Sequence, residues 1–130
     1  MAVRFVNTIV FVKNIEASKE FYTNIVGLHI LDDYGTIVFF ENHFVIHNAQ
    51  SITHTVFKRD DPAAADNQGR KNILIYLESD TLEETYEKIR NAAVNILHGI
   101  EKQEWGQRVF RFYDPDGHMV EIGEPFRLTF

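Results

Sequence analysis

Hydrophobic and polar positions alternate along the start of the chain in a way that is typical of a β-strand. In the segment 5–12, FVNTIVFV, one face carries Phe5, Asn7, Ile9 and Phe11. The other face carries Val6, Thr8, Val10 and Val12. Because both faces are largely apolar, the pattern predicts a central strand of a sheet.

The periodicity changes to that of a helix over 14–27, NIEASKEFYTNIVG. Asn14 is a favourable N-cap residue, Glu16 suits the first turn, and Gly27 is placed to end the helix. Between them runs an apolar stripe with four-residue spacing, which consists of Ala17, Phe21 and Ile25. Short strands are predicted next at 28–32, 36–40 and 43–48.

The pattern weakens between residues 49 and 70. THTVF at 53–57 is predicted as a short strand, and the polar segment 59–70, RDDPAAADNQGR, as an exposed linker. After it the first order of elements returns. We predict a strand at 72–77, a helix at 81–92 that Thr81 and Glu84 cap as a capping box, and strands at 95–98, 107–113 and 118–123.

The two halves match residue by residue. An offset of 65 positions pairs Asn7 with Asn72, Ile9 with Leu74, Phe11 with Tyr76 and Phe21 with Tyr86. In the later strands the offset shifts to 71, pairing Gly35, Val38 and Phe39 with Gly106, Val109 and Phe110, and then to 75 for HFVI (43–46) with HMVE (118–121). This internal repeat predicts an α+β fold of two tandem βαβββ modules, 1–58 and 71–130, joined by the linker 59–70 within one domain, 1–130.

Composition narrows the class of protein. The 130 residues are 45% hydrophobic and include 11 phenylalanines, which favours a packed globular domain. The net charge of −6 and the scattered basic residues argue against nucleic acid or an anionic membrane as a partner. The sequence contains no cysteine, which excludes disulfides, thiolate nucleophiles and cysteine-based metal centres. Because no secretory leader or bilayer-length apolar run is evident, we expect a cytoplasmic protein.

One carboxylate stands inside an apolar strand near the end of the chain. In the segment 111–124, RFYDPDGHMVEIGE, the residues 114–117 have the composition of a turn, and Glu121 shares a strand face with Met119. Either Glu121 lies on an edge strand in contact with water, or it lines a cavity. His118, directly after the turn, is expected to be solvated.

Two segments carry a family resemblance, IVFVKNIEASKEFYTNIVGL (9–28) and FRFYDPDGHMVEIGE (110–124). They resemble the vicinal oxygen chelate superfamily, which includes glyoxalase I, bleomycin-resistance, fosfomycin-resistance and extradiol dioxygenase proteins. The resemblance implies a curved mixed sheet that two βαβββ modules form around a pocket. In metal-dependent members, a divalent ion in that pocket holds two vicinal oxygens of the substrate, as Lewis acid and template.

The resemblance also implies where metal ligands would stand. Glu121 takes the place of the carboxylate ligand on the last strand, whereas Asn7 and Asn72 stand where the first strands of the modules usually carry stronger donors. The fourth place falls on Ile46 by the repeat, or on His47 if the register slips by one residue. Carboxamides are weak ligands for first-row metals, so we expect no cofactor and a divalent metal that is weakly bound or absent.

Three functional hypotheses follow. The first is a protein that binds a small organic ligand through Asn7, Asn72, His47 and Glu121, either to sequester it or as an enzyme in which Glu121 is the general base. The second is a metal-dependent lyase or isomerase similar to lactoylglutathione lyase, with His47 and Glu121 as ligands. The third is a drug-sequestering protein similar to bleomycin-resistance proteins, which the acidity favours. A homodimer is expected because related modules commonly pair about a two-fold axis.

Overall fold

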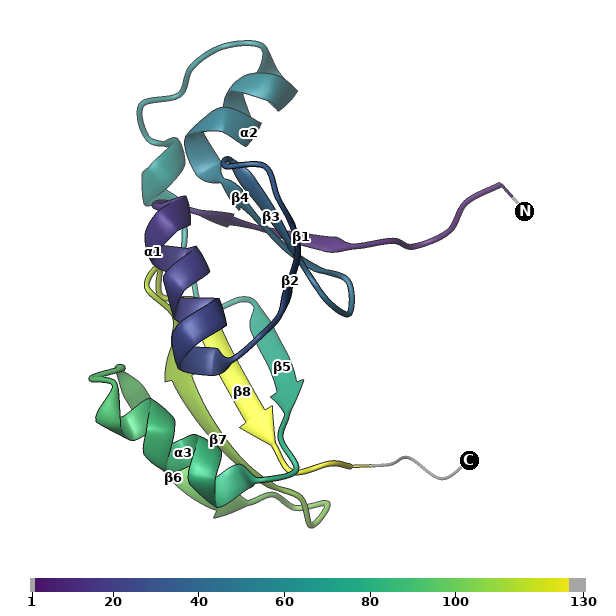
Figure 1. Cartoon of the computed structure of the whole chain (residues 1–130). Helices are drawn as coiled ribbons and strands as arrows, with labels where there is room; N and C mark the ends of the chain where they lie inside the picture. The colour runs from purple at the N-terminus through teal and green to yellow at the C-terminus, as the bar shows by residue number, and fades with distance from the viewer. Residues whose placement is uncertain (1, 127–130) are drawn as a thin grey trace. The chain divides into compact units, whose positions relative to one another are not determined.

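The computed structural model describes residues 2–126, and the chain divides into two compact units, Met1–Gln68 and Gly69–Phe130. Each unit is an α+β arrangement built around one four-stranded mixed sheet (Figure 1). Within the described residues, no helix has both the length and the apolar composition that crossing a membrane requires.

The first unit follows the order strand, helix and three strands. Its sheet has the strand order β1-β4-β3-β2, in which β1 and β4 are parallel and the other neighbours antiparallel. The elements are β1 (Thr8–Val12), α1 (Ile15–Glu20), β2 (Ile30–Asp33), β3 (Ile37–Phe40) and β4 (Phe44–Asn48). Because β1 is an edge strand of this sheet, the prediction that the segment 5–12 forms a central strand is wrong within the unit. Ile9 and Phe11, on one face of β1, are 44% and 37% exposed.

The second unit repeats this topology. Its strand order is β5-β8-β7-β6, with β5 parallel to β8 and the remaining pairs antiparallel. The elements are β5 (Leu74–Glu78), α3 (Leu82–Asn91), β6 (Ile96–Lys102), β7 (Arg108–Tyr113) and β8 (Met119–Gly123). The tandem βαβββ order predicted from the sequence is therefore confirmed.

The helix of the first unit begins as predicted and ends differently. Asn14 is the N-cap, and its side-chain oxygen accepts a hydrogen bond from the backbone N–H of Ala17 at 3.1 Å. After α1 the chain continues as a π-helix over Phe21–Val26. Gly27 then ends the helical segment with a φ of 97°, a left-handed conformation that glycine adopts without strain.

Two local predictions are wrong. The segment 53–57 is not a strand, because it lies in the helix α2 (Ala49–Phe57), whose N-cap Asn48 accepts a hydrogen bond from the backbone N–H of Ser51. Thr81 precedes α3 as predicted but, within the described residues, makes no side-chain capping bond. Instead the Ser79 hydroxyl accepts a hydrogen bond from the Thr81 backbone N–H. The region 59–70 is irregular except for a short 3₁₀ turn, Ala64–Asp66.

Aromatic side chains pack each sheet against its own helix. In the first unit the Tyr22 ring lies edge-on to Phe40 and Phe44, with centroids 6.1 Å and 5.0 Å away. In the second unit the Tyr86 ring of α3 meets Phe110, which stacks on Phe112. Since side chains alternate along a strand, the residues between these aromatics point to the opposite face of each sheet.

The register of the strands corrects the repeat offsets. Phe11 pairs with His47 across β1 and β4, and Tyr76, which lies 65 positions after Phe11, pairs with Glu121 across β5 and β8. His47 is therefore the structural equivalent of Glu121, at an offset of 74 rather than 75. The offset of 71, which pairs Val38 with Val109, is also wrong within the strands. Val38 points to the helical side of its sheet, as Phe40 does, whereas Val109 points to the face away from the helix, because its neighbour Phe110 faces the helix.

Candidate functional site

Glu121 lies in the interior of a sheet and is almost completely buried. Its strand, β8, is hydrogen-bonded to β5 on one side and to β7 on the other, and 5% of the residue is exposed. The interpretation of Glu121 as a solvated residue on an edge strand is therefore wrong. Because the neighbouring strand turns Phe110 and Phe112 toward α3, Arg111 and its register partner Glu121 lie on the sheet face opposite the helix.

Arg111 holds the buried carboxylate in a short ion pair. Its Nε donates to Glu121 Oε1 at 2.7 Å, and the side chains of Arg111 and Glu121 are 24% and 7% exposed. The terminal nitrogens of the guanidinium contact His98 Nε2 and Gln103 Oε1, each at 3.0 Å. The charge of Glu121 is thus balanced by a fixed side chain of the same sheet.

Polar residues extend this pair into a row across the sheet. The successive register partners are His98 on β6, Arg111 on β7, Glu121 on β8 and Tyr76 on β5. The Tyr76 hydroxyl donates to Glu78 at 2.5 Å, and burial together with this carboxylate raises the pKa of Tyr76. The phenol therefore remains protonated at neutral pH, as a hydrogen-bonding group.

The structure resolves which residue of β4 shares the face opposite α1. Phe44 contacts Tyr22, so that Ile46, two positions later, also points toward the helical segment and is fully buried. His47 therefore points to the other face, beside Phe11. Its Nδ1 lies 3.1 Å from the Asn48 carbonyl oxygen and donates to it.

The two asparagines lie just before the first strands of their units. Asn7 precedes β1 and is half-buried, and Asn72 precedes β5 and is exposed. By alternation, Asn7 shares a face with Ile9 and Phe11. Asn7 and His47 belong to the first unit, and Asn72 and Glu121 belong to the second. The convergence of all four in one site stays a prediction.

The donor chemistry does not fit a transition metal at Glu121. The two asparagines offer neutral carboxamide oxygens, which are weak ligands, and the only carboxylate of the predicted set already accepts a bond from the Arg111 guanidinium. A divalent ion coordinated by Glu121 would lie within a few ångströms of that fixed positive charge. We therefore derive no chemistry through a metal at this position.

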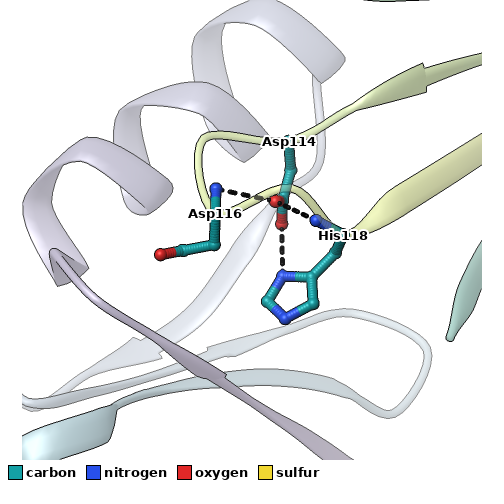
Figure 2. A group of neighbouring side chains, drawn as sticks. All are labelled: Asp114, Asp116 and His118. Carbon is teal, nitrogen blue, oxygen red and sulfur yellow. Dashed lines mark hydrogen bonds and ion pairs between the residues drawn. The ribbon is translucent and has the colours of Figure 1, made fainter. Parts of the chain in front are cut away.

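A second polar cluster lies in the turn between β7 and β8. One potential ligand atom from each of Asp114, Asp116 and His118 lies within 4.8 Å of the others, a grouping that could hold a metal ion (Figure 2). Asp114 Oδ1 accepts hydrogen bonds from the backbone N–H groups of Asp116 and His118, both at 2.9 Å. Its Oδ2 lies 2.9 Å from His118 Nδ1. These bonds already give the cluster a structural role, which is to close the turn that places β8.

His118 is buried, so the expectation of a solvated residue is wrong. Only 6% of it is exposed. Burial alone would lower the pKa of His118, but the hydrogen bond and the charge of Asp114, with the charge of Asp116, outweigh it and raise the pKa. An open cavity of about 490 Å³ lies beside this turn, and its lining is Gly69, Lys71, Asn95, Tyr113, Asp114, Pro115 and Gly117.

Sequence reasoning found Glu121 and missed its partner Arg111. The sequence does contain a signal for Arg111, which is a charged residue inside the otherwise apolar segment FRFY. Arg111 precedes Asp116 by the same number of positions as Glu121 follows it. In a hairpin centred on Asp116, such positions face each other. His98 and Gln103 had no comparable signal, because bulges shift the register of β6 against β7.

Comparison with known proteins finds relatives over nearly the whole chain. Residues 5–127 match the model of the glyoxalase-like domain family. The chain is 27% identical over 123 residues to a protein of Lysinibacillus sphaericus named metallothiol transferase FosB, covering 94% of this chain and 83% of that protein.

Two solved structures are similar to the chain. A protein of unknown function from Agrobacterium tumefaciens is 43% identical, covers 97% of both chains and has a TM-score of 0.87. A glyoxalase/bleomycin resistance protein/dioxygenase from Nocardioides is 20% identical, covers 99% of this chain and 91% of its own, and has a TM-score of 0.73. The second likeness shows the fold that both chains share.

Proposed function

The chain belongs to the glyoxalase-like domain family, within the vicinal oxygen chelate superfamily, and on that premise we propose that it binds a small organic molecule without a divalent metal. Glu121 is the central binding residue of this proposal. Asn72, of the same unit, is a further hydrogen-bonding group of this proposal, and a contribution of Asn7 and His47 stays a prediction.

The observation that carries the proposal is the ion pair between the buried carboxylate of Glu121 and the partly buried guanidinium of Arg111. Taking such a carboxylate out of water costs several kcal/mol, and well-packed apolar residues would often serve stability as well or better. The pair stands on the sheet face opposite α3, in register with His98 and Tyr76. Such a polar row in a family of ligand-binding and catalytic proteins supports a recognition role.

The proposal gives Glu121 a role in binding rather than in proton transfer. Its Oε1 already accepts a hydrogen bond from Arg111 at 2.7 Å, so the carboxylate is held in one orientation. A fixed carboxylate of this kind accepts hydrogen bonds from hydroxyl, amide or ammonium groups of a ligand. Tyr76, which remains protonated, can support the same ligand.

A ligand screen tests the proposal. Thermal shifts against a panel of polar metabolites, in the presence of a chelator, should identify compounds that stabilise the wild-type protein. Calorimetry should then show that Glu121→Gln weakens the best compound by about 10-fold or more, the worth of one charge-assisted hydrogen bond.

Glu83→Gln is the matched control, because Glu83 is also paired with an arginine, Arg108, but belongs to α3. This variant should leave affinity unchanged. Equal affinities of the wild type and Glu121→Gln for every compound would contradict the assignment of Glu121 to the site.

A further inference from the structure

Four acceptor side chains converge on the guanidinium of Arg111. Glu121 Oε1 lies 2.7 Å from Nε, and His98 Nε2 lies 3.0 Å from one terminal nitrogen. Gln103 Oε1 lies 3.0 Å from the other terminal nitrogen. Glu101 Oε1 lies 3.7 Å from the terminal nitrogen that contacts His98. All five residues belong to the second unit.

The imidazole in this group is oriented toward a cation. His98 Nδ1 lies 2.8 Å from the Gly99 carbonyl oxygen, which accepts hydrogen bonds only, so Nδ1 carries the proton. Nε2 is then unprotonated and directs its lone pair at Arg111. A backbone carbonyl that fixes the tautomer in this way is the usual support of a histidine that ligates a metal.

We propose that this group is an internal cation site whose resident cation is Arg111. Two carboxylates, one imidazole nitrogen and one amide oxygen form a donor set that first-row divalent metals accept. The guanidinium occupies the centre of that set and keeps divalent ions from Glu121.

The proposal also restricts the ligand class, and in this respect alone it rests on the proposed function. The cluster contains one positive side chain, Arg111, and two negative ones, Glu121 and Glu101. Its excess of negative charge disfavours phosphate, phosphonate and carboxylate groups. A neutral or cationic molecule that donates hydrogen bonds is the class that fits this face.

Cobalt(II) is a suitable probe because its visible absorption reports coordination by nitrogen and oxygen. Five full-length proteins purified without added metal would be titrated: the wild type, Arg111→Met, Arg111→Lys, Glu121→Gln, and Arg111→Met combined with Glu121→Gln. Arg111→Met keeps a long side chain and removes the charge, and Arg111→Lys keeps the charge. All five retain Asp114, Asp116 and His118, so any cobalt held in that turn contributes equally.

Arg111→Met should bind cobalt at least ~100-fold more tightly than the wild type. At an effective dielectric constant near 20, a unit charge at about 4 Å already opposes another like unit charge by on the order of a thousandfold in affinity, and cobalt(II) carries two charges. Glu121→Gln should abolish this gain, and Arg111→Lys should show none. The proposal would be overturned if folded Arg111→Met binds cobalt no more tightly than the wild type. It would also be overturned if the Arg111→Met change raises cobalt affinity equally with and without the Glu121→Gln change.

Two further readouts cover the remaining outcomes. If Arg111→Met does not fold, the cobalt affinities of the wild type and of Glu121→Gln are compared. Equal affinities support the proposal, and a wild-type affinity that is lost in Glu121→Gln overturns it. Inorganic phosphate should not stabilise the wild type against heat. Stabilisation by phosphate that disappears in Arg111→Lys would overturn the ligand class, while the metabolite screen would separately report on the proposed function.

Discussion

Replacing Gly69 by alanine should destabilise the protein more than the same change at Gly35 or Gly117. All three glycines have positive φ angles, of 68°, 86° and 84° respectively, which a residue with a Cβ adopts at a cost of about 1 kcal/mol. The three sites differ in what the added methyl group would meet.

Space around each site sets the expected magnitudes. At Gly35 nothing lies within 4 Å of the new Cβ, and at Gly117 the nearest atom is Gly69 Cα at 3.5 Å, an ordinary contact. At Gly69 the Cβ would overlap the backbone oxygen of Asp116 and lie 3.1 Å from Gly117 Cα. Overpacking against backbone costs a further ~1–3 kcal/mol, so Gly69→Ala should cost about 2–4 kcal/mol in total, against about 1 kcal/mol at the other two positions.

Urea unfolding followed by circular dichroism would measure these differences, with Gly35→Ala as the matched control for the φ angle alone. The expected difference arises because residue 69 packs directly on the turn that leads into β8. A Gly69→Ala variant within about 0.5 kcal/mol of Gly35→Ala would refute it.

Three further predictions concern the fold and its charges. Because the pKa of His118 is raised in the folded protein, the stability that its protonated form contributes is present below about pH 6.5 and is lost as the pH rises through the folded value. The difference in unfolding free energy between the wild type and His118→Gln should therefore shrink from pH 6 toward about pH 9, and a difference that grows would contradict the sign. Fragments 1–58 and 70–130, expressed separately, should each lack cooperative unfolding by circular dichroism, because the edge strands and apolar faces of a lone module are uncovered; a fragment that unfolds cooperatively would disprove this. Light scattering should give twice the mass of one chain at micromolar concentration, and the mass of a single chain would count against the homodimer.

The order of elements could be predicted because strand and helix periodicities differ clearly in most segments. The helix α2 was missed for a physical reason. Thr53, Thr55 and Val56 are β-branched and favour a strand by propensity, whereas the cap at Asn48 and the contacts of the unit favour a helix. In this segment, capping and packing determine the structure rather than the local strand propensity.

The site was predicted only in part, because a strand pattern gives the face of a residue but not its partners. Glu121 was recognisable as a carboxylate in an apolar strand. Arg111 depends on how the intervening turn sets the register, and the choice between Ile46 and His47 depends on a shift of one residue. Both were settled by the hydrogen-bonded pairing of the strands rather than by residue type.

The central claim, that this member of the family binds its organic ligand without a metal, is tested most directly by one calorimetric comparison. The best compound of the metabolite screen would be titrated into protein freed of metal by a chelator, and again into protein with two equivalents of zinc. We expect the two dissociation constants to agree within about twofold, because Arg111 already supplies the cation at Glu121. Binding that appears only with zinc, and disappears in Glu121→Gln, would contradict it.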